Sequence, residues 1–274
     1  MKCIDFDAQF SKYTTQWVAQ NASKYKNADE MEADFPDVYL KWLNTPADWL
    51  GRVSPSMYFA QYDNAKMLVK WMRDYFKQGV AVPDLMLDRI VQLGEAAVAE
   101  LMILLEKPAR DEDEAKMCAI GMLTQLESDA PFALYVKWMA QAQPGDDLAE
   151  RAADALTPYA AQCRQLLLDA YDGATDTGKA LFLDVLAYVR EDDRVFELLM
   201  RQFAQGNNPA LYASYLLKYG DERALPELER ALNDPALPYL DYIEVRNAVE
   251  ALGGEVLHER DFSGDEDYEA LRQI

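Results

Sequence analysis

The sequence predicts an all-α fold, a solenoid of stacked helix pairs with an N-terminal helical cap. Apolar residues recur at helical spacing along the chain, and the alternation typical of strands is nearly absent. Leucine anchors recur at intervals of 30, 33, 30, 30 and 36 residues, at Leu93, Leu123, Leu156, Leu186, Leu216 and Leu252. Near-constant spacing in this range is typical of solenoids built from helix pairs.

The N-terminal segment, residues 1–80, is expected to be helical. Aromatic residues separated by four, three and four positions define one face of a first helix: Phe6, Phe10, Tyr13 and Trp17. A wider apolar stripe predicts a later helix, at Leu68, Trp71, Met72, Tyr75 and Phe76. Gly79 follows at the position where helices favour a left-handed cap, and Pro83 opens the next helix.

Residues 81–256 are expected to form the helix pairs, followed by an acidic tail over 257–274. Each pair has an apolar face that it cannot bury alone, so neighbouring pairs must stack, and residues 1–80 would cap the open end. Small residues near the anchors would let adjacent helices approach closely, at Ala119, Ala152, Ala155, Ala213 and Ala248.

One helix pair is specific in its residues. Gly220 in "YGDERALPELERALNDP" (219–235) can take a positive φ at the corner, and Asp221 can cap the following helix. Leu225, Leu228 and Leu232 make the buried stripe of that helix. Followed by "VRNAVEALGG" (245–254), this segment resembles the short HEAT-like repeats also seen in phycobilin lyases. The match covers about two repeats, and the upstream pairs share only the apolar skeleton.

The stretch "WLNTPADWLGRVSPSMYF", residues 42–59, is rich in aromatics and prolines. Thr45 is expected to be an N-cap with Pro46 at the first helical position, and Ser54 with Pro55 repeats the arrangement. Gly51 is expected to stop the short helix between them. This interpretation predicts a packed corner with both tryptophans, Trp42 most firmly, buried between crossing helices.

The same stretch, followed by "LVKWM", is similar to the toxin-binding motif of Xre/MbcA/ParS-type antitoxins. Trp42, Pro46, Leu50 and Pro55 match that motif, but Gly51 follows Leu50 directly and the usual small residues after the second proline are missing. The resemblance implies a partner-binding surface. Its candidate residues are Trp42, Pro46, Trp49, Leu50, Pro55 and Tyr58.

The charge balance limits the possible partners. The chain has 48 acidic and 27 basic residues, a formal charge of −21. Such a charge repels phosphate backbones and anionic membranes, so neither nucleic acid nor membrane is an expected partner. Cys3, Cys118 and Cys163 show no CxxC pairing, and no signal peptide or membrane span is evident, so we expect a cytoplasmic protein.

Residues for catalysis or metal binding are scarce. His258 is the single histidine, in the acidic C-terminal segment, so a histidine-based triad or a multi-histidine metal site is not expected. No phosphate-binding glycine loop occurs, and "GDED" (264–267) does not fit a calcium-binding loop. Cys118 and Cys163 fall in helical patterns, where an inert thiol is expected. We therefore expect no enzyme activity, no cofactor and no metal.

The leading functional prediction is a non-catalytic protein-interaction scaffold. The second helices of successive pairs would line a concave surface, and a partner of unknown identity would need a basic surface to complement the charge. Three alternatives remain open: an enzyme or chromophore- or small-molecule-handling protein with a site in the groove, a toxin-binding antitoxin-like module at the N-terminus, and a DNA-lesion binder, which would need a basic groove.

Overall fold

The computed structural model describes residues 3–107, 112–256 and 260–272. It is 73% helical, which confirms the prediction of an all-α chain. Within the described residues no strand forms, and the only sheet-like feature is an isolated bridge between Ala47 and Val53. None of the helices in the described part of the chain is long and apolar enough to cross a membrane.

The chain divides into two compact units, Met1–Pro131 (unit 1) and Phe132–Ile274 (unit 2). Helix α5 (Ala65–Gln78) packs against the three helices that follow it, α6 (Asp84–Gln92), α7 (Glu95–Leu105) and α8 (Asp113–Gln125). The expected N-terminal segment and the first expected helix pairs therefore belong to one compact unit.

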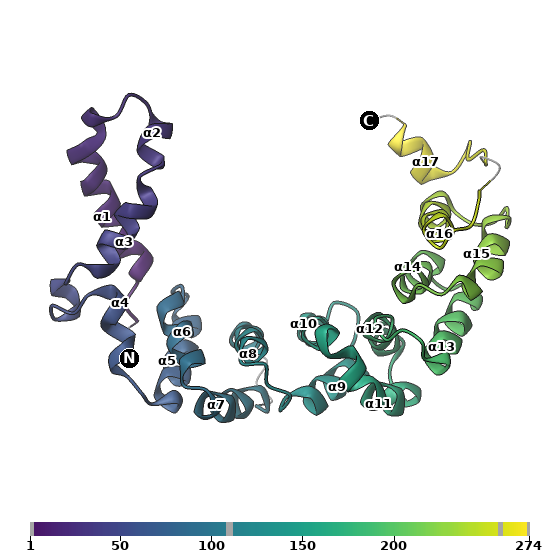
Figure 1. Ribbon diagram of the computed structural model, residues 1–274, viewed down its shortest axis with the longest axis horizontal. Helices are drawn as coiled ribbons and strands as arrows, with labels where there is room; N and C mark the ends of the chain where they lie inside the picture. The colour runs from purple at the N-terminus through teal and green to yellow at the C-terminus, as the bar shows by residue number, and fades with distance from the viewer. Residues whose placement is uncertain (1–2, 108–111, 257–259, 273–274) are drawn as a thin grey trace. The chain divides into compact units, whose positions relative to one another are not determined.

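Unit 1 begins with four α-helices: α1 (Phe6–Asn21), α2 (Ala28–Glu32), α3 (Phe35–Asn44) and α4 (Pro55–Tyr58). Figure 1 shows α1 and α3 running side by side. The predicted end of α5 is confirmed, because Gly79 is left-handed with φ 63°. Leu68, Met72 and Tyr75 form its buried stripe, and Pro83 is the N-cap residue of α6, which begins at Asp84.

Unit 2 contains nine α-helices within the residues described. They are α9 (Phe132–Ala140), α10 (Asp147–Leu156), α11 (Ala160–Ala170), α12 (Asp176–Leu186), α13 (Asp193–Ala204), α14 (Pro209–Tyr219), α15 (Leu225–Leu232), α16 (Tyr239–Ala251) and α17 (Glu266–Leu271). In Figure 1, α10, α12, α14 and α16 follow one another along one side of this unit, and α11, α13 and α15 lie along the other. Helices of the two rows pack pairwise, as α11 with α12, α13 with α14 and α15 with α16.

The leucine anchors lie where the sequence analysis placed them, in the core. All are buried except Leu93, which is half-buried at the end of α6. The alanines near the anchors are buried as well. Gly178 of α12 marks a close approach of two helices, because a Cβ there would lie 3.2 Å from the Cα of Ala140 in α9. A small residue therefore allows close packing at Gly178, a position that the sequence analysis did not select, while the predicted alanines are shown to be buried.

Long-range hydrogen bonds in unit 2 join residues separated by about one leucine interval. Thr175 Oγ1 donates to the Ala142 carbonyl at 2.7 Å, 33 residues away. The Tyr219 hydroxyl accepts from the Asp192 N–H at 2.9 Å and donates to its carbonyl at 3.0 Å, across 27 residues. Lys218 forms an ion pair with Asp184 across 34 residues. Each of these interactions therefore joins two segments of unit 2 that lie about one leucine interval apart in the sequence.

The corner at 219–226 is as predicted. Gly220 has φ 77°, and the Asp221 carboxylate accepts from the Arg223 N–H at 2.9 Å. Leu228 and Leu232 are buried, and Leu225 is half-buried.

The C-terminal segment differs from the solvated acidic tail that the sequence suggested. Phe262 is buried, with its ring 5.0 Å from that of Tyr239 and 4.9 Å from that of Tyr242. Asp265 caps α17 and accepts from the Tyr239 N–H at 3.1 Å. One aromatic side chain thus docks this acidic segment on α16, while most of its carboxylates stay exposed. His258 lies outside the described residues.

Candidate functional site

The corner at residues 42–59 is packed. Trp42 and Leu50 are each 7% exposed, and Pro55 is buried as well. Trp49 and Tyr58 are half-buried, and only Pro46 among the six candidate partner-binding residues is exposed. The predicted burial of Trp42 is confirmed.

Ring contacts explain this burial. Phe6 of α1 lies 5.4 Å from Trp49 in an edge-to-face arrangement and 6.0 Å from Tyr58, measured between ring centroids. Trp42 stacks on Trp49 at 6.4 Å and touches Phe10 at 5.1 Å. The aromatic side chains are therefore used to join α1, α3 and the loop after α3, which supports the structural interpretation of this stretch.

The predicted N-cap at Thr45 is wrong. Thr45 ends α3 instead, and its hydroxyl donates back to the Lys41 carbonyl at 2.6 Å. The next short 3₁₀-helix begins at Asp48, because the Ala47 N–H donates to the Val53 carbonyl and the Arg52 N–H donates to the Ala47 carbonyl. These bonds keep the chain extended around Pro46.

The other helix boundaries predicted in this stretch are confirmed. Gly51 ends the 3₁₀-helix in the left-handed region, with φ 66°. Ser54 is the N-cap residue of α4, and Pro55 occupies its first position.

Three apolar residues face outward here, and none of them was among the six candidate partner-binding residues. Leu40 is 54% exposed on α3, Met57 is 58% exposed on α4, and Tyr39 is 39% exposed. An apolar stripe identifies the buried face of a helix, and it gives no information about apolar residues on the other faces of that helix. Leu40 is two positions away from both Val38 and Trp42, which is the signal that would have placed it outside.

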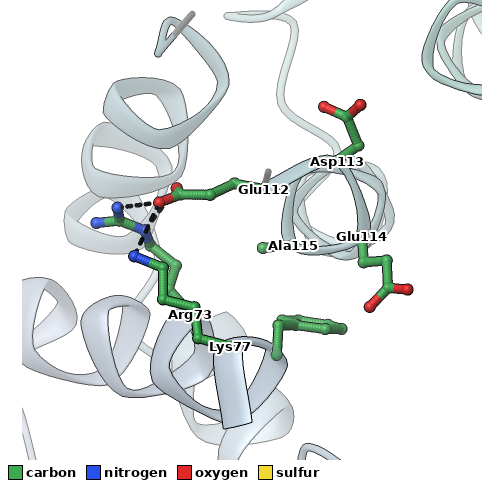
Figure 2. Close-up of a pocket in the computed structure, with 7 residues that line it drawn as sticks. Arg73, Lys77, Glu112, Asp113, Glu114 and Ala115 are labelled. Atoms are coloured by element: carbon green, nitrogen blue, oxygen red, sulfur yellow. Dashed lines mark hydrogen bonds and ion pairs between the residues drawn. The ribbon is translucent and has the colours of Figure 1, made fainter. Parts of the chain in front are cut away.

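A charged cluster joins α5 to the start of α8 (Figure 2). Arg73 donates from Nε to Glu112 Oε2 at 2.8 Å and from Nη2 to Oε1 at 2.5 Å. Lys77 Nζ lies 3.2 Å from the same Oε1. An adjacent hollow of about 250 Å³ is lined by these three residues together with Phe76, Asp113, Glu114 and Ala115.

The electrostatics of this cluster argue against catalysis. The hydrogen bonds from Arg73, with further help from Lys77, lower the pKa of Glu112 to about 2. The carboxylate is therefore ionised near neutral pH and has no proton to donate, and its lone pairs are engaged by the two cations. Glu112 is only 8% exposed and serves to hold α8 against α5. Local sequence patterns could not predict this ion pair, because Arg73 and Glu112 are 39 residues apart.

The row formed by α10, α12, α14 and α16 is acidic. These four helices carry eight acidic and four basic side chains. Lys218 is paired with Asp184, and Arg246 Nε lies 2.8 Å from Glu250. The exposed carboxylates of the row are Asp147, Glu150, Asp154, Asp176, Glu244 and Glu250. The sequence predicted a negative surface but not its place on this row.

The cysteine thiols and the acidic clusters give little support for nucleophilic chemistry or for metal binding. Cys163 is fully buried, and burial raises the pKa of the half-buried Cys118 thiol to about 11, so that thiol is protonated near neutral pH. No group of three or more His, Cys, Asp or Glu within the described ranges is placed to hold a metal ion.

A larger open hollow, about 840 Å³, lies between the loop after α13 and the loop after α15. Its lining includes Phe203, Pro209, Glu227, Asp234 and Asp241. Asp241 accepts from the Ala210 N–H at 3.3 Å, so this carboxylate already serves to join α14 to α16.

Comparison with known proteins gives no relative. The chain matches no family model, no curated protein and no solved structure. The HEAT-like and antitoxin-like resemblances therefore stay predictions that depend on the residues quoted for them.

Proposed function

We propose that the chain is a HEAT-like α-solenoid that acts as a non-catalytic protein-interaction scaffold. The partner would bind along the row of α10, α12, α14 and α16, which are the first helices of the expected pairs and not the second helices that the sequence favours. The observation that carries this proposal is the acidic character of that row, where eight acidic side chains accompany four basic ones.

The helix ties within unit 2 support the solenoid part of the proposal. Each tie joins residues about one leucine interval apart, as Thr175 with Ala142 and Tyr219 with Asp192. Contacts between successive pairs are what distinguish a stacked array from a globular bundle, in which distant segments also meet. Such an array presents one row of helices as a continuous surface.

The charge of the row defines the partner. Exposed carboxylates on α10, α12 and α16 create a negative potential that attracts a lysine- or arginine-rich surface and repels an acidic one. Of the four basic side chains of the row, Lys218 and Arg246 are held in ion pairs within it. A basic protein segment therefore fits this face better than a nucleic acid or an anionic small molecule does.

The antitoxin-like alternative has less support. Of its six candidate residues, Trp42, Leu50 and Pro55 are buried, and Trp49 and Tyr58 are half-buried against Phe6 or Trp42. An interface anchor must be exposed before the partner arrives. These side chains hold the corner together instead.

The test is affinity capture with charge-matched variants. The tagged full chain captures partners from a native lysate of cells that produce it, and the bound proteins are quantified by mass spectrometry. In one variant the three acidic residues of α10 are neutralised, as Asp147→Asn, Glu150→Gln and Asp154→Asn. A control variant neutralises the three acidic residues of α2, as Asp29→Asn, Glu30→Gln and Glu32→Gln.

We expect a basic partner to be retained by the control and lost, by tenfold or more, from the α10 variant. Capture that is equal in both variants, or a partner with an acidic binding surface, would contradict the proposal. Circular dichroism of both variants establishes that the helices are intact.

A further inference from the structure

Helix α14 differs in charge from its two neighbours in the row, α12 and α16 (Figure 1). The eight acidic side chains of the row lie on α10, α12 and α16, and α14 carries none of them. The one basic side chain of α14, Lys218, is paired with Asp184 of α12. Leu211, Ser214 and Leu217 of α14 are half-buried and reach the surface. A largely apolar helix therefore lies between two acidic ones.

Exposed apolar side chains lie at both ends of α14. At its start, the Ala210 N–H donates to Asp241 Oδ1 at 3.3 Å, and Leu240, the neighbour of Asp241, is 49% exposed. At its end, Lys218 Nζ lies 5.7 Å from the centre of the Tyr188 ring, and Tyr188 is 51% exposed. Ala210 and Lys218 are separated by about 12 Å along the helix axis. We call this surface the α14 strip, made of Tyr188, Leu211, Ser214, Leu217 and Leu240.

Exposed carboxylates flank the α14 strip on both sides. Asp176 is exposed at the start of α12. Burial, with a further contribution from Asp176, raises the pKa of Tyr212 on α14, so this carboxylate lies near α14. On the other side, Glu244 is exposed one turn after Leu240 on α16. A ligand on the strip therefore meets apolar atoms at its centre and negative charge at its two edges.

We propose that the α14 strip binds an amphipathic helix of the partner, with the apolar face of that helix on the strip and lysine or arginine along both flanks. Residues seven or eight positions apart on one face of a helix are separated by about 10–12 Å, which matches the rise of α14 between Ala210 and Lys218. A disordered basic tail would use the carboxylates alone and leave Tyr188 and Leu240 uncovered. The inference rests on the proposed scaffold function, because it specifies the form of the basic partner.

The test compares two fluorescein-labelled peptides of about 18 residues, a helix about 27 Å long. Both contain the same leucines, lysines and alanines. In the ordered peptide the leucines recur at three- and four-residue spacing, and in the shuffled peptide they are scattered around the helix. Fluorescence anisotropy measures the dissociation constant of each peptide from the full chain at moderate salt. We expect the ordered peptide to bind at least tenfold more tightly.

Variants of the full chain locate the binding site. Tyr188→Ser combined with Leu240→Ser should reduce the preference for the ordered peptide to less than about threefold, because the two exposed apolar anchors are lost. Leu166→Ser is the matched control, because Leu166 is 44% exposed on α11 in the opposite row, and it should leave the preference unchanged. Asp176→Asn combined with Glu244→Gln should weaken the binding of both peptides. Circular dichroism checks that each variant is folded.

Equal binding of the two peptides would overturn the inference, as would a preference that survives the Tyr188 and Leu240 double variant or is lost in Leu166→Ser. If the peptides bind equally and both weaken in the Asp176 and Glu244 double variant, helix recognition is overturned while the acidic scaffold is supported. If neither peptide binds, helix recognition is overturned, and lysate capture with the α10 variant decides the scaffold function separately.

Discussion

Gly178 offers the sharpest test of how one helix pair stacks on the next. It lies in α12, where α12 crosses α9, and it is buried. A Cβ built on Gly178 would lie well inside van der Waals contact with the Met139 carbonyl oxygen and 3.2 Å from the Ala140 Cα. Both obstacles are backbone atoms, so no side chain can rotate away.

Two effects of Gly178→Ala oppose each other. Alanine stabilises a helix interior by about 1 kcal/mol relative to glycine. Overpacking against a rigid neighbour costs about 1–3 kcal/mol, and sometimes more. Because the obstructing atoms belong to the α9 backbone, which Thr175 also anchors through a 3.0 Å hydrogen bond from its N–H to the Ala140 carbonyl, we expect the clash to dominate. A clash with rigid backbone atoms belongs in the upper part of that range, about 2–3 kcal/mol, so the net loss in the free energy of unfolding should be about 1–2 kcal/mol.

Urea denaturation followed by circular dichroism measures this loss. Gly173→Ala is the matched control, because Gly173 is exposed, has no atom within 4 Å of its built Cβ and does not need a positive φ. We expect the control to unfold within about 0.5 kcal/mol of the wild type. A Gly178→Ala variant as stable as the wild type, or more stable, would refute the close α9–α12 contact.

Three further variants test other parts of the structure. Gly220→Val should lower the free energy of unfolding by about 1–3 kcal/mol in a urea titration, because a β-branched residue is strained at φ 77°; an unchanged midpoint would contradict this. Trp42→Ala should cost about 3–5 kcal/mol by the same assay, and native Trp42 should resist acrylamide quenching in a single-tryptophan variant. Glu112→Gln should cost about 1–3 kcal/mol at pH 7. The pKa of Glu112 is about 2 in the folded chain against an ordinary 4.5. The stabilisation by the ionised carboxylate is therefore complete above pH 4.5 and is lost as pH falls toward 2. The free energies of unfolding of the wild type and of Glu112→Gln should converge near pH 2.

Local sequence patterns predicted the structure correctly where a single residue determines the backbone conformation. Gly79 and Gly220 were predicted to be left-handed caps because few other residues tolerate positive φ, and both are. The burial of Trp42 followed from the packed corner that the aromatics and prolines of residues 42–59 predict. These predictions needed only neighbours in the sequence.

Features that depend on distant residues were missed. Thr45 was predicted to be an N-cap, but the bridge between Ala47 and Val53 keeps the following chain extended. The ion pair between Arg73 and Glu112 joins residues that are 39 positions apart. Phe262 is buried, but its neighbours in the sequence are acidic and indicate an exposed segment. Tertiary contacts override local propensity at such positions, and no spacing rule identifies the partner.

The acidic row of unit 2 is the centre of the proposed function, and carboxylate footprinting tests it most directly. A water-soluble carbodiimide labels exposed carboxylates, and mass spectrometry compares the full chain alone with the full chain bound to its captured partner. The account predicts that labelling falls at Asp147, Glu150, Asp154, Asp176 and Glu244, which lie on α10, α12 and α16. Labelling that stays unchanged there, while it falls at Glu197 or Asp169 on the opposite row, would contradict it.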